Sequence, residues 1–362
     1  MTPNTRLETL DWLRGFAALS IMVYHVRLWH FGAPDASTFL GRMGIYGVSI
    51  FFVLSGLSMA VAYAHFIVDM RTSAIFLVRR AFRIWPLLWV CVALVMVPEL
   101  AQCDGACARK VVANMTTTFG FVAPGDYINA GAWSIGNEVV YYALTPFILI
   151  VNERSRLVGN LLALVAFGVA MVFSFHLLTP GTSLAAQWGV YINPFHNLVF
   201  YLLGIFIYYN TKDMRLGAAL TVGFLLAAFG VFAFYPVTGN QIRIIAGPAR
   251  LVFMAATLAL VIAAYKFDAP ERVPRVIRAV LRRLGDATYG VYLLYPVVDV
   301  YAGRALARLG IAEPMGVAIA APTLTVGLAI VSYEYFEKPI IRLGRSLTQT
   351  WRKVPMAPTV NS

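Results

Sequence analysis

The chain contains 362 residues, of which 60% are hydrophobic and 13% are charged, and its mean hydropathy is +0.73. A soluble domain carries about 25% charged residues, so this composition excludes an ordinary soluble protein. The formal net charge is +12. Nucleic-acid binding is nevertheless not expected, because the positive charge is not gathered in a basic domain outside the apolar segments.

Hydrophobic residues gather in runs that are long enough, or nearly so, to cross a hydrocarbon core of about 30 Å. These runs lie at about residues 12–29, 45–64, 84–101, 133–151, 157–178, 192–209, 216–235, 249–265, 288–303 and 315–336. The sequence lacks the short alternating segments that are typical of a membrane β-barrel. It therefore predicts an all-α fold, namely a polytopic integral membrane protein with about ten transmembrane helices.

Ten spans leave no room for a soluble domain. We expect one transmembrane domain over residues 1–345 and a short cytoplasmic tail over residues 346–362. Most of the 29 Lys and Arg residues lie in the even-numbered connections and in the two tails. Because cytoplasmic loops are enriched in Lys and Arg, both termini are predicted to be cytoplasmic.

Two ionisable residues, Arg14 and His25, interrupt the first apolar run. A helix turns about 100° per residue, so the two side chains return to nearly the same face, about 16 Å apart. Ionisable groups at membrane depth are costly and usually mark a functional site. Histidine also exchanges protons near neutral pH. The pair predicts chemistry inside the bilayer.

Three further charged residues lie at the ends of predicted spans. Arg80 and Arg83 stand three residues apart, share a helix face and lie where the third span meets the cytoplasm. A guanidinium fork suits a phosphate, although these cations can also be simple positive-inside anchors. Glu138 opens the fourth span in an otherwise apolar stretch. An acid in that position needs a partner or handles a proton.

The exterior connection at about residues 102–132 contains Cys103 and Cys107. Outside the cytoplasm these two thiols can form a disulfide that closes a small loop. A metal site is the weaker interpretation, because no histidine lies near them. The third cysteine, Cys91, lies in an apolar run and is expected to be a packing residue.

Five motifs follow one another along the chain. They are LDWLRG at 10–15 with His25 eleven residues after its arginine, FFVLSG at 51–56, RRAFRIWP at 79–86, WSIGNEVVYY at 133–142 and SYEYFEKP at 332–339. Together they resemble the acyltransferase-3 family of membrane-bound acyltransferases over nearly the whole chain. Two departures stand out. Trp12 replaces the usual glycine, and Tyr295 stands where many members have histidine.

The resemblance implies an enzyme that moves an acyl group, often acetyl, from acetyl-CoA or another cytoplasmic acyl-CoA to a hydroxyl. The expected acceptor is a carbohydrate or a lipid-linked molecule, such as an O-antigen or exopolysaccharide unit, and the expected location is the bacterial inner membrane. No metal is expected.

In such an enzyme Arg80, Arg83 and Arg14 would bind the CoA phosphates. His25 would be the general base. Arg14 and Glu138 complete the predicted catalytic residues, with Glu138 either orienting His25 or binding the acceptor. Asp11, three residues before Arg14, is placed to pair with its guanidinium.

A secondary transporter with an intramembrane Arg, His and Glu relay is the main alternative. It is less favoured, because the two halves of the sequence show neither a repeat nor paired broken helices. The identity of the acceptor, the length of the acyl group, direct transfer against an acyl-enzyme, protein partners and the oligomeric state stay open at this point.

Overall fold

The computed structural model describes residues 8–267, 273–311 and 313–353. The regular elements within these ranges are helices, which confirms the all-α prediction. The longer helices are α1 (Glu8–Phe31), α2 (Phe39–Tyr63), α3 (Met70–Met96), α6 (Ala132–Arg154), α7 (Arg156–Val172), α9 (Pro194–Thr211), α10 (Ala218–Phe234), α12 (Pro248–Lys266), α14 (Thr288–Arg308) and α15 (Pro314–Ser332).

Shorter helices connect or extend these elements. They are α4 (Gly105–Met115), α5 (Phe119–Val122), α8 (Trp188–Tyr191), α11 (Ile242–Ile245), α13 (Arg275–Asp286) and α16 (Lys338–Lys353), with the one-turn segments η1 (Val97–Gln102), η2 (Phe173–Leu177), η3 (Ala185–Gln187) and η5 (Tyr333–Glu337). Each of the ten apolar runs of the sequence falls on one of the longer helices, in places together with an adjoining short turn.

By length and composition, six helical segments of the described chain can cross a membrane. They are Phe39–Tyr63, Met70–Glu99, Ala132–Arg154, Arg156–Leu177, Pro248–Lys266 and Pro314–Trp351. A seventh is possible if Ala185–Tyr191 and Pro194–Thr211, bent by 55°, form one broken span. The prediction of a polytopic membrane protein is therefore confirmed, whereas six or seven segments, not ten, meet this criterion.

Polar content and length explain the difference. Helix α1 has 24 residues, but it carries acidic, basic and histidine side chains along its length. Helix α14 has 21 residues and includes Asp299, Arg304 and Arg308. Helix α10 is apolar but has only 17 residues. The two ends, residues 1–7 and 354–362, lie outside the described residues, so the orientation of the termini stays a prediction.

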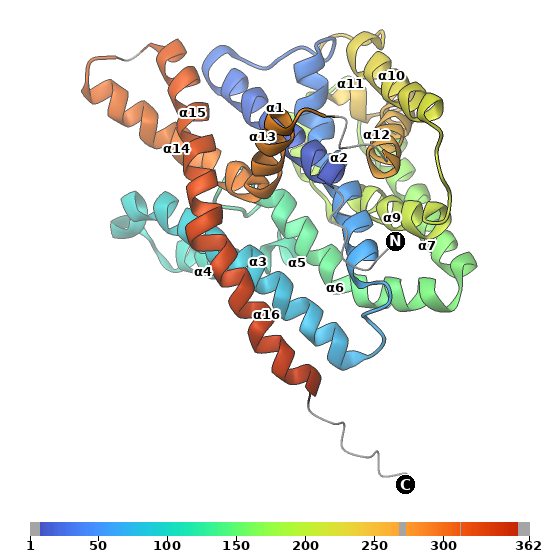
Figure 1. Ribbon diagram of the computed structural model, residues 1–362. Coiled ribbons are helices and arrows are strands. Elements are labelled where there is room, and N and C mark those ends of the chain that lie inside the picture. The colour runs from blue at the N-terminus through green and yellow to red at the C-terminus, as the bar shows by residue number, and fades with distance from the viewer. Residues whose placement is uncertain (1–7, 268–272, 312, 354–362) are drawn as a thin grey trace.

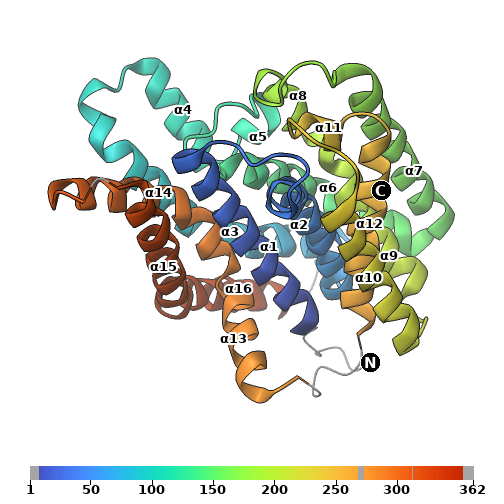
Figure 2. The ribbon, with the colours of Figure 1, turned by 90° about the horizontal axis from the view of Figure 1, so that it is seen from above.

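The helices form two groups on either side of a central set, as Figures 1 and 2 both show. Helices α7, α9, α10 and α12 lie on one side, and α4, α14, α15 and α16 lie on the other, with α1, α2 and α6 between them. Helix α2 is the most buried of the candidate spans and packs against α1 and α9.

Glycine makes the contact between α2 and α9 close. A Cβ atom on Gly56 would collide with the carbonyl of Tyr201, and one on Gly204 would collide with the carbonyl of Val53. Small residues at such contacts let two membrane helices approach backbone to backbone. Ser55 and Ser58 of the same helix instead contact Glu138 on α6 and Arg14 on α1, respectively.

Local capping fixes where two of the elements begin. The side chain of Asp69 accepts a hydrogen bond from the backbone amide of Thr72 at 2.7 Å, which caps α3 and lowers the pKa of the Asp69 carboxyl. Asp104 caps α4 in the same way by accepting from the amide of Cys107 at 2.8 Å. The pairing of Cys103 with Cys107, which the sequence leaves open, is present as a disulfide.

The C-terminal helix continues from the last span. Helices α15 and α16 are joined through η5, and in Figure 1 they form one long rod that crosses α3. Helix α16 runs across the boundary expected between residues 345 and 346. The division into a membrane domain and a tail stays a prediction.

Candidate active site

A cavity of about 440 Å³ lies between α1, α2, α3, α6, α14 and α16. Its lining includes four of the five site residues that the sequence predicts, namely Arg14, Arg80, Arg83 and Glu138. The fifth, His25, is not among the lining residues. Segments that are far apart in the sequence are thus brought together at one site.

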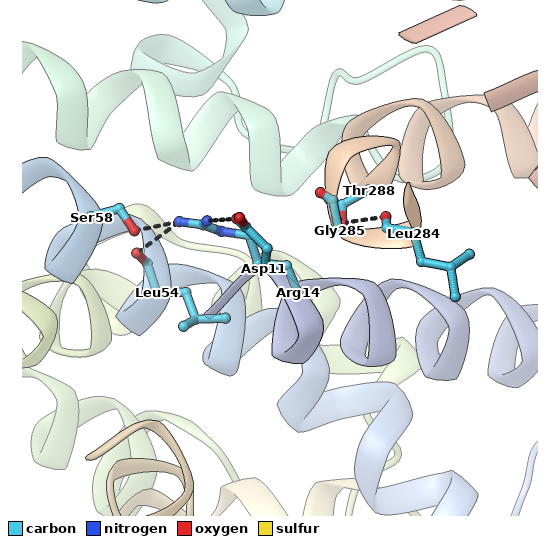
Figure 3. Close-up of polar contacts among 7 residues, drawn as sticks. All are labelled: Asp11, Arg14, Leu54, Ser58, Leu284, Gly285 and Thr288. Atoms are coloured by element: carbon cyan, nitrogen blue, oxygen red, sulfur yellow. Dashed lines mark hydrogen bonds and ion pairs between the residues drawn. The ribbon is translucent and has the colours of Figure 1, made fainter. Parts of the chain in front are cut away.

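Arg14 is held by both α1 and α2 (Figure 3). Its guanidinium donates to Asp11 Oδ1 at 2.8 Å, to the carbonyl of Leu54 at 3.4 Å and to the Ser58 hydroxyl. The predicted ion pair with Asp11 is therefore confirmed. The Arg14 side chain remains 26% exposed, so the charge is oriented but still faces the cavity.

Helix α13 ends against the Asp11 turn of α1. A Cβ atom on Gly285 would lie 2.6 Å from the carbonyl oxygen of Asp11, so only glycine allows this approach. The hydroxyl of Thr288 donates to the carbonyls of Leu284 and Gly285 and joins α13 to α14 (Figure 3). The closely packed backbones of α1 and α13 therefore form the wall of the cavity beside Arg14.

Arg80 lies in a cage of aromatic rings. Its guanidinium carbon is 5.4 Å from the ring centre of Tyr63, 5.9 Å from that of Phe76 and 5.8 Å from that of Tyr142. One terminal nitrogen donates to the Tyr63 hydroxyl at 3.0 Å, and Nε is buried with no hydrogen-bond partner among the described residues. Aromatic faces stabilise a cation without neutralising it. The positive charge of Arg80 therefore remains available to bind an anion.

The neighbouring arginines are more fully paired. Arg83 lies 3.3 Å from Glu337 Oε2 and 5.4 Å from the ring centre of Tyr289. Arg79, which also lines the cavity, donates from Nε to the hydroxyl of Thr348 at 2.9 Å. Of the three arginines predicted for phosphate binding, Arg80 is therefore the one that pairs with no carboxylate in the described chain.

Glu138 accepts hydrogen bonds from two hydroxyls on the cavity wall. The Ser55 hydroxyl donates to Glu138 Oε1 at 2.7 Å, and the Tyr142 hydroxyl donates to the same oxygen. The structure gives no contact between Glu138 and His25 in the described residues, so the expectation that Glu138 orients His25 is not met in this conformation. The Glu138 carboxyl instead lies near Arg80. Tyr142 connects the two, because its hydroxyl donates to Glu138 and its ring centre is 5.8 Å from the guanidinium carbon of Arg80.

His25 lies behind the aromatic wall of the cavity. Its Nδ1 is 2.9 Å from the carbonyl oxygen of Ile21 and 3.2 Å from the Tyr295 hydroxyl, and its ring packs on Tyr295 and Trp29. The ring of Tyr295 is in turn 6.1 Å from that of Tyr292, which lines the cavity. Because α1 is continuous, His25 stands about 16 Å along the helix from Arg14.

Nδ1 of His25 lies against the Ile21 carbonyl, which can only accept, and against the Tyr295 hydroxyl, which can donate or accept. When the neutral ring carries its proton on Nδ1, it donates to Ile21 and the lone pair is on Nε2. In this tautomer Nε2 can act as a general base. The geometry can therefore support proton abstraction on the side of the ring away from Ile21.

Sequence reasoning missed several residues of the cavity. Ser58 and Tyr63 on α2, Arg79 on α3 and Arg345 on α16 line it as well. Ser58, Tyr63 and Arg345 lie outside the quoted motifs, and a hydroxyl or a lone arginine has no spacing signal of its own. Tyr295, noted as a departure from the family pattern, is the direct partner of His25.

The structure defines a polytopic membrane protein with a charged cavity between its spans, where arginines face a carboxylate and hydroxyls. Residues 7–334 match the acyltransferase domain of the acyltransferase-3 family. The chain belongs to this family, and it is a membrane acyltransferase. Membership in an enzyme family decides against the transporter alternative.

Two curated relatives are similar along most of their length. Nodulation protein 10 of Rhizobium leguminosarum bv. viciae is 25% identical over 94% of this chain and 95% of its own. Exopolysaccharide production protein ExoZ of Rhizobium meliloti (strain 1021) is 26% identical over 84% of this chain and 92% of its own. No solved structure matches the chain.

Proposed function

We propose that this enzyme is an O-acyltransferase of the bacterial inner membrane that moves an acyl group, acetyl in the first instance, from cytoplasmic acyl-CoA to a hydroxyl of a carbohydrate. An O-antigen or exopolysaccharide unit, free or lipid-linked, is the acceptor class. The observation that carries the proposal is the cavity itself, whose lining holds Arg80, which no carboxylate pairs in the described chain, together with Glu138 and several hydroxyls.

Donor binding follows from the arginines. The phosphates of acyl-CoA would bind Arg80 first, with Arg83 and Arg14 as further donors, since a guanidinium binds phosphate through two parallel hydrogen bonds. The phosphate would share Arg83 with Glu337, which lies 3.3 Å from it. The pantetheine arm would then extend along α1 toward His25, over the distance of about 16 Å that separates Arg14 from His25.

The chemistry then uses His25. Nε2 would take the proton of the acceptor hydroxyl, the oxygen would attack the thioester carbonyl, and the CoA thiolate would leave and recover the proton. For this to occur the thioester must reach the Tyr292–Tyr295 wall, which separates His25 from the cavity. Glu138 and Ser55, already hydrogen-bonded to each other at 2.7 Å, are placed to bind acceptor hydroxyls.

The acceptor is supported by the relatives. One of them is named for exopolysaccharide production, which agrees with a surface carbohydrate as acceptor. The test is a comparison of surface glycans by NMR from cells with the gene, without it, and with the gene restored. We expect one O-acyl ester to be lost and regained, and its position identifies both the acceptor and the acyl group. Unchanged glycan and lipid esters in all three strains would contradict the proposal.

A further inference from the structure

The last helix, α16, lies beyond the part of the chain that matches the family, which ends at residue 334. Two contacts fix it against α3. A Cβ atom on Gly344 would lie 2.6 Å from Cγ of Phe82, so the backbone of α16 rests directly on that ring. One turn further, the hydroxyl of Thr348 accepts a hydrogen bond from Arg79 Nε at 2.9 Å.

This docking places one face of α16 in the wall of the cavity. Ile341 and Arg345 both belong to the lining, although no family motif includes them. In Figure 1 the rod formed by α15 and α16 crosses α3, and α16 packs against that helix. Arg345 thereby joins the arginines of α3 at the same opening.

Arg345 differs from the other arginines of the cavity in the contacts of its guanidinium. The guanidinium groups of Arg14, Arg79, Arg80 and Arg83 each make a hydrogen bond or an ion pair. Within the described ranges the guanidinium of Arg345 makes neither, and its side chain is exposed. The lining as a whole carries five arginines against Asp11, Glu138 and Asp286. A cavity whose lining carries this excess of positive charge favours the binding of a polyanion.

We propose that Arg345 is a donor-binding residue that contacts the phosphorylated nucleotide end of acyl-CoA and thereby selects CoA thioesters over thioesters without phosphate. The argument rests on the function proposed above, and it adds a residue from outside the family domain to the donor site. The shared chemistry is a phosphate ester, which a lipid headgroup also carries, so the test separates the two sources.

The experiment measures CoA affinity by calorimetry, with the full-length protein in nanodiscs of phosphatidylcholine alone. A charged hydrogen bond to phosphate contributes about 1.5–3 kcal/mol, so Arg345→Gln should raise the Kd for CoA about tenfold or more, and Arg345→Lys should recover part of the loss. Arg342→Gln is the matched control, because Arg342 is exposed on the same helix and does not line the cavity. Its Kd should equal that of the wild type.

Turnover supplies the second measurement. With acetyl-CoA as donor, Arg345→Gln should raise KM about tenfold and leave kcat unchanged. With S-acetyl-N-acetylcysteamine, a thioester without phosphate, the variant and the wild type should behave alike.

Equal CoA affinity in wild type and Arg345→Gln would overturn the assignment and leave the proposed function standing. A difference that appears only when phosphatidylglycerol is added would assign Arg345 to lipid headgroups and overturn it as well. Failure of the wild type to bind CoA would overturn both proposals.

Discussion

Two regions of the molecule bury arginines and use them differently. Arg42 on α2 and Arg250 on α12 are 1% and 0% exposed, deep between α2, α9, α10 and α12. Arg14 and Arg83 at the cavity keep 26% and 29% of their side chains exposed. A buried cation is thus no sign of function by itself. What distinguishes the cavity is access: its arginines face an open space, whereas Arg42 donates to backbone carbonyls and Arg250 lies over the rings of Tyr46 and Phe200.

Arg42 shows what a structural arginine does. Its Nε donates to the carbonyl of Ala36 at 2.7 Å, and a terminal nitrogen donates to the carbonyl of Phe232 at 3.1 Å. Further bonds run to the carbonyls around the end of α10. The guanidinium therefore ties the start of α2 to the end of α10, and its donors are occupied by backbone.

The two regions differ most sharply in what a neutral replacement does to folding. Arg42→Met should lower the free energy of unfolding by about 3–5 kcal/mol, because several buried carbonyls lose a charged donor at once. The measurement is a denaturant titration of the purified protein in detergent. A variant as stable as the wild type would remove the contrast between the two regions.

In the cavity, a neutral replacement of an arginine should weaken ligand binding more than it lowers folding stability. Arg80→Gln should raise the Kd for CoA by a factor that corresponds to about 1.5–3 kcal/mol, because a phosphate loses its charged partner. Calorimetry against the wild type measures the change. The control is Arg109→Gln, since Arg109 is exposed on α4 and outside the cavity lining. Equal CoA affinity in Arg80→Gln would return Arg80 to the role of a positive-inside anchor.

The smallest effect concerns the partner of His25. Tyr295→Phe keeps the ring that packs on His25 and removes only the hydroxyl at 3.2 Å. The loss of one neutral hydrogen bond corresponds to about 0.5–1.5 kcal/mol, so turnover should fall a few-fold with the Kd for CoA unchanged. A loss as large as that of a general base would show that the Tyr295 hydroxyl itself takes part in the chemistry.

The sequence predicts the residues of the cavity better than their contacts. Helical periodicity and membrane cost single out Arg14, Arg80, Arg83 and Glu138, and all four line one cavity. The partners of Arg80 are aromatic rings from three helices, and no spacing rule connects Tyr63 on α2 with Tyr142 on α6. Such contacts depend on tertiary packing.

The same limit applies to Arg42 and Arg250. Arg42 lies just before the apolar run at about residues 45–64 and Arg250 near the start of the run at about 249–265, and neither position marks the side chain as buried. The structure buries both, because α2 begins before its apolar run and α12 begins at Pro248. Six or seven helical segments of the described residues, against ten apolar runs, meet the length and composition criterion for a span. Apolar runs mark buried helices as well as membrane-spanning ones.

The most direct test of the account is His25→Gln, measured as release of the CoA thiol from acetyl-CoA in membrane vesicles that contain the native acceptor. Glutamine keeps the size and hydrogen bonding of the ring but cannot accept a proton at neutral pH. A general base contributes about 10²–10⁴ in rate, so we predict a loss of that order with CoA affinity retained, because the proposed phosphate partners Arg14, Arg80 and Arg83 lie away from His25 on α1 and α3. Turnover close to the wild-type rate in the folded variant would contradict the central claim.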